Sequence, residues 1–448
     1  MSPPPPADQA VVASAFPPIA VPQHAPSWNA KLAKSTRFLT KLLAASGPGY
    51  LIAVGYMDPG NWATDIAGGS QFGFALLPII VLSNLVAMLL QWMALRLGIA
   101  TGQDLAQLCR ARYSPATSRF LWATCEIAII ACDLAEVIGT AIALKLLFHL
   151  PMLLGVTLTA FDTLLIMGLQ KSGFRKLEAF VIALMGVIGA CFIYEMIASH
   201  PSAGALLGSF VPSASTPLNS AALYLGLGIF GATVMPHNLY LHSSISQQRT
   251  TDYSISGKKE SIRFASIDCF AALTISVLIN AAILITAASA FHWSGHSGVA
   301  TIEDAYKLLT PTLGAGAASI VFAIALLAAG QNSTLTGTMA GQIVMEGFLG
   351  LKMHPCYRRM LTRGLAILPA LAVTALSGEG ATSKLLIFSQ VVLSLQLGFA
   401  VIPLVRFTSD AELMGYFVNG RWVRRAGYAL AALIVSVNAW LVVQTVAI

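Results

Sequence analysis

The chain alternates long apolar stretches with short polar ones from about residue 45 to its end. A helix needs about 20 mainly apolar residues to cross the roughly 30 Å of hydrocarbon in a bilayer, and most of these stretches reach that length. The pattern predicts an all-α polytopic membrane protein. We predict eleven membrane-spanning helices, at about 45–69, 74–99, 119–148, 151–170, 177–197, 220–247, 264–291, 313–347, 360–379, 384–405 and 426–446.

Composition and charge agree with this topology. Charged residues make up only 10% of the 448 residues, against about 25% in a typical soluble domain. With the N-terminus in the cytoplasm, all but three of the 26 lysines and arginines fall on the predicted inner side, where basic residues collect. The exceptions are Lys145, Lys307 and Lys384. The C-terminus is then extracellular or periplasmic, and the net charge of +7 gives no reason to expect nucleic acid.

The same pattern divides the chain into five parts. Residues 1–43 are rich in proline and predict a disordered cytoplasmic tail. We expect a first five-helix repeat at 44–197, an extracellular linker at 198–219 and a second, inverted five-helix repeat at 220–407. Residues 408–448 then hold a cytoplasmic loop and the eleventh helix.

Two of the predicted spans contain helix-breaking sequences. The first span contains "MDPGN" at 57–61, and the sixth contains "MPH" at 235–237. Proline lacks an amide hydrogen and disfavours helical backbone in the residue before it, so we expect Asp58 and Met235 to be non-helical. Five spans separate the two breaks, and five is odd, so the second unit enters the membrane inverted. Broken helices at matching places in inverted repeats are typical of transporters, although proline and glycine also kink membrane helices for packing.

The residues at the breaks offer ligands for a cation. Asp58 and Asn61 supply a carboxylate and an amide oxygen, which suit any hard cation. A thioether from Met235 favours a transition metal over Mg²⁺ or Ca²⁺, and a carbonyl freed by the break, such as that of Ala232, can complete the set. Most methionines only fill gaps in a core, so the role of Met235 stays open at this point.

The predicted third span carries three acids on one helix face: Glu126, Asp133 and Glu136. We expect no lysine or arginine inside the hydrocarbon to pair with them. Ionisable groups at such depth normally face a water-filled or protein-lined path, and burial disfavours the charged carboxylate, so these acids can exchange protons. His237, directly after the second break, can relay protons near neutral pH. The alternative is that the acids only bond to neighbouring hydroxyl or backbone groups.

Four motifs together carry a family resemblance. "MDPGN", "MPH", "TGQDLAQL" at 101–108 and "GQNSTLTGTMAGQIVMEGF" at 330–348 resemble the Nramp family of proton-coupled divalent metal transporters, from about residue 42 to the end. The resemblance implies a LeuT-like 5+5 inverted repeat with broken helices 1 and 6, an appended eleventh helix and a metal bound at the two breaks.

The family's site residues carry over onto matching positions. The resemblance implies that the metal ligands are Asp58, Asn61, the Ala232 carbonyl and Met235, joined in some states by Gln390. By the same resemblance, Met235 implies a place with the manganese and iron carriers of the family.

The resemblance also implies a proton route. This route runs from Asp58 past His237 to Asp133 and Glu136, with Glu126 on the same helix face. For His242 a structural role is as well supported as a role in transport. Arg358 and Arg359 resemble paired arginines of the family but could equally be inner-side anchors. Gly398 stands where a proline is expected, which makes the geometry of the tenth span uncertain.

These features predict a secondary transporter and not an enzyme. We expect import of Mn²⁺, Fe²⁺ and related ions with protons by alternating access, in a bacterial inner membrane, by a monomer without a cofactor. The chain has no GxxxxGK[ST] motif, so ATP is not expected as the energy source. One alternative is a Na⁺-coupled amino-acid carrier of the same fold. A membrane metalloenzyme is the more remote one, because no HExxH motif is present.

Overall fold

The computed structural model describes residues 46–162, 168, 173–210, 220–250, 252–299, 301–314, 316–351, 353–377 and 379–446. The predicted tail at 1–43, residues 163–167 and 169–170 of the predicted fourth span and residues 211–219 of the predicted linker lie outside these residues. The chain divides into two units, Met1–Ala44 and Ala45–Ile448, and the second holds every described helix. Across the described ranges the secondary structure is helical, without a strand.

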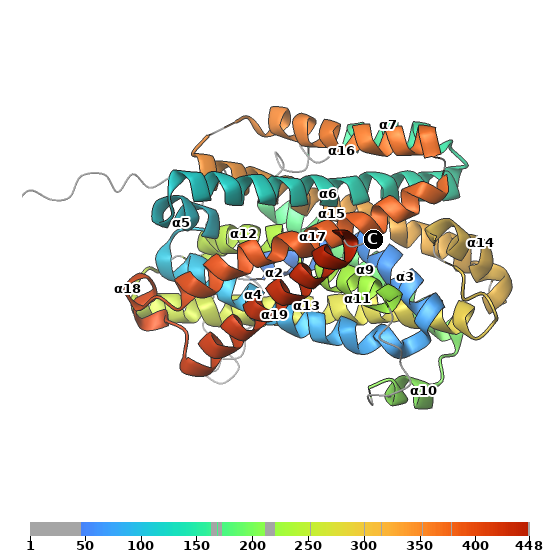
Figure 1. Ribbon diagram of the computed structural model, residues 1–448, viewed down its shortest axis with the longest axis horizontal. Helices are drawn as coiled ribbons and strands as arrows, with labels where there is room; N and C mark the ends of the chain where they lie inside the picture. The colour runs from blue at the N-terminus through green and yellow to red at the C-terminus, as the bar shows by residue number, and fades with distance from the viewer. Residues whose placement is uncertain are drawn as a thin grey trace, which may run out of the picture. The chain divides into compact units, whose positions relative to one another are not determined.

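The described helices follow one another closely along the chain (Figure 1). Before residue 210 they are α2 Pro48–Gly55, α3 Pro59–Phe72, α4 Leu77–Thr101, α5 Leu105–Arg112, α6 Pro115–Phe148, α7 Met152–Leu158, α9 Phe174–Ser199 and α10 Ala203–Gly208. After residue 219 they are α11 Ser220–Val234, α12 Pro236–Ile245, α13 Ile255–Ala287, α14 Ile302–Leu313, α15 Ala318–Leu349, α16 Pro355–Ser377, α17 Glu379–Thr408, α18 Ala411–Met414 and α19 Arg421–Val446.

Seven helical stretches of the described chain are long and apolar enough to cross a bilayer. They are Pro59–Thr101, Pro115–Phe148, Arg175–Ser199, Ile255–His292, Ala318–Leu349, Tyr357–Leu376 and Ala381–Thr408. The number differs from the eleven predicted spans partly because the breaks divide the first and sixth into short helices, and α3 runs on into α4. The count of eleven therefore stays a prediction.

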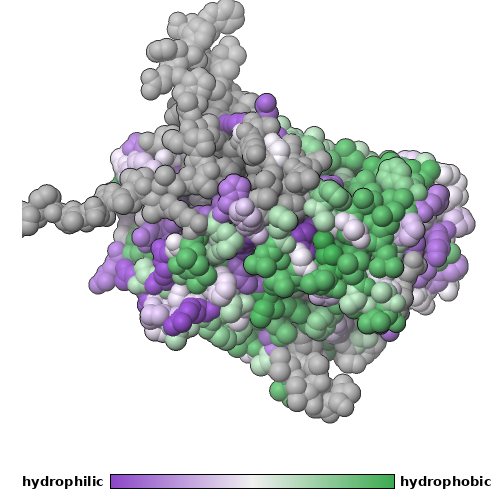
Figure 2. Space-filling view, turned by 90° about the horizontal axis from the view of Figure 1, so that it is seen from above, coloured by the Kyte–Doolittle hydropathy of each residue, from purple (hydrophilic) through white to green (hydrophobic). Residues whose placement is uncertain are grey.

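The outer surface fits a lipid environment. Many large apolar side chains are exposed, among them Leu85 on α4, Ile127 on α6 and Leu368 on α16. Figure 2 shows a broad hydrophobic surface with hydrophilic residues on either side of it. Apolar residues that face hydrocarbon cost nothing there, whereas a soluble protein rarely exposes so large an apolar area. The protein is a multi-pass membrane protein.

Helix packing brings the two breaks into the interior. Helix α6 packs against α15, α16 and α17, and Figure 1 shows it running alongside them. Helix α3 packs against α11 and α13, and α12 packs against α4 and α15. Trp62 on α3 is fully buried, with edge-on ring contacts to Phe192 at 4.9 Å and Phe322 at 5.2 Å. The start of α3 is therefore held firmly.

The "TGQDLAQL" motif forms a tight corner between α4 and α5. Gly102 ends α4 with a φ of 70°, a left-handed conformation that glycine adopts easily. Asp104 then caps α5 in a reciprocal capping box with Gln107. The amide of Leu105 donates to the Ser243 hydroxyl at 2.9 Å, which ties this corner to α12.

Helix α17 contains Gly398, the residue that left the geometry of the predicted tenth span uncertain. The helix runs without interruption from Glu379 to Thr408 through this residue, because glycine keeps the amide hydrogen that proline lacks. A Cβ at Gly398 would lie 3.2 Å from the Val435 side chain of α19, so the glycine also allows close packing there.

Candidate metal site at the two helix breaks

The first break has the geometry that its sequence predicts. Helix α2 ends at Gly55 and α3 begins at Pro59, with Asp58 in an extended conformation between them (φ −67°, ψ 162°). Asp58 Oδ1 accepts hydrogen bonds from the Asn61 amide at 2.8 Å and from Asn61 Nδ2 at 2.7 Å. A carboxylate is favoured here because a helix N-terminus presents free amides and the positive end of its dipole.

The second break is sharper. Met235 separates α11 from α12 with φ 21° and ψ 99°, so the prediction of non-helical backbone is confirmed here as well. A positive φ is uncommon for a bulky residue, and such strained positions cluster at functional sites.

The structure brings the two breaks together. Asn61 Nδ2 donates to the Ala232 carbonyl at 3.1 Å, which links the start of α3 to the last turn of α11. Asp58, Asn61 and Ala232 are all completely buried. Asp58 Oδ2 and Asn61 Oδ1 have no hydrogen-bond partner among the described residues. Buried oxygens without partners are costly, and a bound cation would satisfy both.

The two remaining predicted ligands lie beside this cluster. The Met235 side chain is fully buried against Ala131, Cys132 and Leu393. Gln390 of α17 packs on the start of α3 so closely that a Cβ at Gly60 would lie 1.8 Å from Gln390 Nε2. Its Oε1 is buried without a hydrogen-bond partner in the described part of the chain.

The expectation that the third-span acids have no basic partners is wrong. Arginines of α16 bind all three acids of α6. Arg358 lies 2.7 Å from Glu126, and Arg359 lies 3.4 Å from Asp133. Arg363 lies 2.7 Å from Asp133 and 3.4 Å from Glu136.

The physical reason lies in where α16 begins. The helix starts at Pro355, so these arginines occupy its first three turns, and α16 packs against α6. Arg363 also lies 3.2 Å from Asp162, which is not among the predicted site residues. The sequence contains one signal for this pairing. Arg359 and Arg363 are one helical turn apart and share a face of their helix, as Asp133 and Glu136 do on theirs.

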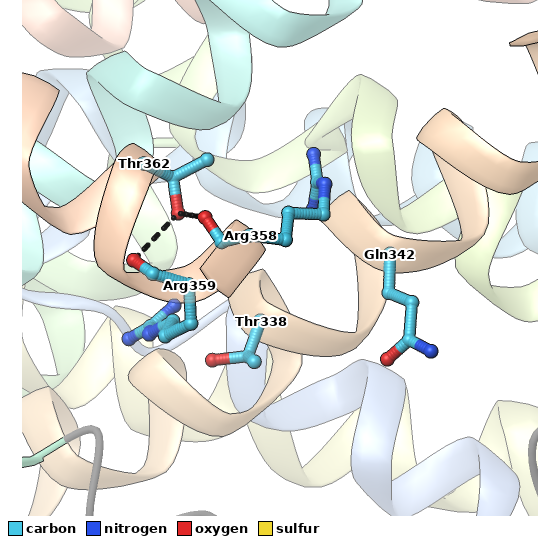
Figure 3. A pocket seen from close by; sticks show the side chains of 5 residues that line it. All are labelled: Thr338, Gln342, Arg358, Arg359 and Thr362. Carbon is cyan, nitrogen blue, oxygen red and sulfur yellow. Dashed lines mark hydrogen bonds between the residues drawn. The ribbon is translucent and has the colours of Figure 1, made fainter. Parts of the chain in front are cut away.

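A small cavity adjoins these arginines. Thr338 and Gln342 of α15 line it together with Arg358, Arg359 and Thr362 of α16 (Figure 3). The Thr362 hydroxyl donates to the carbonyls of Arg358 and Arg359 at 3.3 and 3.2 Å. The cavity measures about 10 Å³, close to the volume that one water requires. Within the described residues, Arg359 Nε and Nη2 are buried and have no hydrogen-bond partner.

The two histidines of α12 differ in their surroundings. His237 is buried, and its Nδ1 has no partner in the part of the chain that the structure describes. His242 Nδ1 lies 2.9 Å from Gln91 Oε1, and Gln91 Nε2 donates to the Tyr56 hydroxyl at 2.9 Å. His242 thus links α12 to α4 and to the end of α2, whereas His237 keeps a ring nitrogen available.

Glu136 also has neutral partners. The Ser333 hydroxyl of α15 donates to Oε1 at 2.9 Å, and the Cys132 thiol lies 3.7 Å from the same oxygen. Asp133, in contrast, accepts a hydrogen bond from Arg363 at 2.7 Å and forms a second ion pair with Arg359 at 3.4 Å.

The chemistry of the site follows from its donors. The described residues hold no group of three or more histidines, cysteines or acids that could bind a metal. The cluster at the breaks instead combines one carboxylate with neutral oxygens and a nearby thioether. Such a set can hold a dehydrated divalent cation while binding it less tightly than a site with several charged ligands, which suits an ion that must leave again.

Comparisons with known proteins identify the family. The family described as natural resistance-associated macrophage protein-like (Nramp) matches residues 49–444. The divalent metal cation transporter MntH of Nostoc sp. is 55% identical over 415 residues, covering 93% of this chain and 94% of that protein. The MntH protein of Bradyrhizobium diazoefficiens is 57% identical over 405 residues, with 90% of each chain covered.

Solved structures are similar as well. The crystal structure of the Eremococcus coleocola manganese transporter, in complex with an aromatic bis-isothiourea compound, matches with a TM-score of 0.83 and 41% identity, covering 92% of this chain and 87% of that one. Mhp1, a nucleobase-cation-symport-1 family transporter, matches with a TM-score of 0.59 at 14% identity, covering 89% of this chain and 93% of that one, which shows a shared fold alone. The fold is LeuT-like, and by the match over residues 49–444 and its identity to the MntH proteins this chain belongs to the Nramp family.

Proposed function

We propose that this protein is a secondary transporter that imports divalent transition-metal ions, Mn²⁺ and also Fe²⁺, together with protons by alternating access. It does so as a monomer in a bacterial inner membrane, with its N-terminus in the cytoplasm and its C-terminus in the periplasm. The observation that carries the proposal is the buried cluster of Asp58, Asn61 and the Ala232 carbonyl at the meeting point of two broken helices. The names of the MntH relatives and of the manganese transporter structures support the choice of cargo.

The two alternatives lose support. Membership of a transporter family makes the protein a transporter and not an enzyme. A Na⁺-coupled amino-acid carrier would have no use for a methionine at the second break, and the matched family argues for a metal ion as cargo.

The donors at the breaks explain how a cation would be selected. Asp58 Oδ2 and Asn61 Oδ1 have no hydrogen-bond partner in the described ranges, and the Ala232 carbonyl lies in the same hydrogen-bonded cluster. Met235 and Gln390 lie beside it and complete the proposed ligand set. A hard ion such as Ca²⁺ gains little from a thioether in exchange for a lost water, whereas Mn²⁺ or Fe²⁺ tolerates it better.

We assign proton movement to Asp58, His237 and the acids of α6. Asp58 would release a proton when the metal binds, and the free ring nitrogen of His237 would pass it toward α6. Asp133 is held by two arginines and is the less suitable acceptor. Within the described part of the chain, Glu136 has one guanidinium contact, at 3.4 Å, so it is the better candidate to take up the proton, and Glu126 lies further along the same network.

Replacing Met235 with alanine tests the selection step. The Met235→Ala variant should retain Mn²⁺ uptake in proteoliposomes but allow excess Ca²⁺ to compete about tenfold better, equal to about 1.4 kcal/mol. The matched control is Met93→Ala, which removes another fully buried methionine, on α4, and should leave selectivity unchanged. A Met235→Ala variant that rejects Ca²⁺ as well as the wild type does would contradict the role of the thioether.

Replacing Glu136 with glutamine tests the proton route. Glutamine keeps the shape of the side chain and can still accept from Ser333, but it cannot take up a proton. Mn²⁺ binding should therefore persist while acidification of the vesicle interior falls to near background. Glu412→Gln, at an exposed acid of α18, is the control. Equal losses of binding and proton movement would show that Glu136 serves the structure only.

A further inference from the structure

A buried asparagine contacts the residue at the second break twice. Asn238 lies in the first turn of α12 and is completely buried. The backbone amide of Asn238 donates to the Met235 carbonyl at 3.1 Å. Its side-chain Nδ2 lies 3.6 Å from the Met235 sulfur. Asn238 Oδ1 has no hydrogen-bond partner among the described residues, so Nδ2 provides the hydrogen bond that the structure shows for this side chain.

The end of α2 closes over this contact. A Cβ on Gly55 would lie 2.4 Å from Asn238 Nδ2 and 3.4 Å from the Met235 sulfur. No real side chain tolerates the first distance, so any larger residue at 55 would displace the carboxamide. Gly55 does not have a positive φ, so what this position requires is space and not a special backbone conformation. The two broken helices therefore meet through Gly55, Asn238 and Met235.

A buried side-chain carboxamide that donates to a thioether is unusual. A thioether is a weak acceptor, and burying a carboxamide costs free energy unless its donors and acceptors are satisfied. A purely structural asparagine would gain more by donating to a backbone carbonyl. A methionine side chain has three rotatable bonds, so without a partner its sulfur could adopt several positions. A donor on one side of the sulfur fixes its position and leaves the second lone pair available.

We propose that Asn238 is a positioning residue that fixes the Met235 sulfur for selection of thiophilic cations, with Gly55 providing the space for its carboxamide. The inference rests on the proposed function, because it requires Met235 to contact the cargo. When Asn238 is lost, the sulfur is no longer held near the cluster of Asp58 and Asn61, and the advantage of soft cations over Ca²⁺ decreases.

Two single variants test the contact from opposite sides. Asn238→Ala removes the donor, and Gly55→Ala displaces it without disfavouring the helix. Each should let Ca²⁺ compete better with Mn²⁺ and should weaken Cd²⁺ binding more than Mn²⁺ binding. The matched control for Gly55→Ala is Gly186→Ala on α9, where an added Cβ meets no atom within 4 Å. If Asn238→Ala does not fold, Asn238→Leu keeps the volume without a donor.

A double-mutant cycle separates this inference from the proposed function. The selectivity of Met235→Ala, Asn238→Ala and the double variant is measured as the ratio of Mn²⁺ to Ca²⁺ affinity. We expect the double variant to equal Met235→Ala alone. If Met235→Ala relaxes selectivity but Asn238→Ala does not, the positioning role is refuted while the proposed function stands. An Asn238→Ala effect that persists in full without Met235 also refutes it. If Met235→Ala leaves selectivity intact, the thioether has no role and both proposals about it fail.

Discussion

Replacing Asp58 with alanine is expected to reduce Mn²⁺ uptake to background. Among the described residues, Asp58 is the one carboxylate of the cluster at the two breaks, and its Oδ2 has no hydrogen-bond partner there and would bind a cation. Alanine also removes the N-cap of α3, which typically costs about 0.5–2 kcal/mol. The measurement is initial Mn²⁺ uptake into proteoliposomes that contain equal amounts of folded protein.

A second variant separates charge from structure at this position. Asp58→Asn keeps an oxygen that can accept from the Asn61 amide, as Asp58 Oδ1 does at 2.8 Å. It should fold like the wild type and still fail to transport. Glu412→Ala, which removes an exposed carboxylate from α18, should transport normally. Wild-type uptake by Asp58→Asn would remove the carboxylate from the metal site.

Replacing Arg363 with methionine is expected to destabilise the protein strongly. Arg363 is fully buried and lies within 3.4 Å of Asp133, Glu136 and Asp162. Removing one partner from a buried ion pair leaves an uncompensated charge and typically costs about 3–5 kcal/mol. The variant should melt at a temperature several degrees lower in detergent and should lose proton-linked uptake. Thermal unfolding followed by fluorescence measures the first effect.

Neutralising the stranded acid should reverse part of this loss. Adding Glu136→Gln to Arg363→Met neutralises the acid that loses its guanidinium contact, whereas Asp133 keeps its ion pair with Arg359 at 3.4 Å. The double variant should therefore be more stable than Arg363→Met alone. Arg424→Met, at an exposed position of α19, is the control and should melt like the wild type. A wild-type melting temperature for Arg363→Met would mean that the network contributes little to stability.

The helix breaks could be predicted from sequence because their cause is local. Proline at 59 and 236 constrains the residue before it whatever surrounds the chain, and both Asp58 and Met235 have the expected non-helical backbone. The meeting of the two breaks was foreseen only through the resemblance to a family, since no local rule places Asn61 beside the Ala232 carbonyl.

The partners of the third-span acids could not be predicted in the same way. The tendency of basic residues to collect on the inner side does not say how deep a given arginine lies or which neighbouring helix its side chain faces. It counts Arg363 with the inner-side charges and leaves Arg358 and Arg359 open as inner-side anchors, whereas α16 presents all three to α6. Such pairing depends on which helices pack together. The hydrogen bond from Asn238 to the Met235 sulfur has the same origin, because it depends on a side-chain direction that the sequence does not state.

The most direct test of the central claim is to record Mn²⁺ entry and internal pH in the same proteoliposomes, with excess Ca²⁺ outside. The account predicts that Mn²⁺ enters, that the interior becomes more acidic as it does so, and that Ca²⁺ does not prevent entry. Mn²⁺ entry without acidification would contradict proton coupling through Asp58 and the acids of α6. The absence of Mn²⁺ entry with folded wild-type protein would contradict the metal site itself.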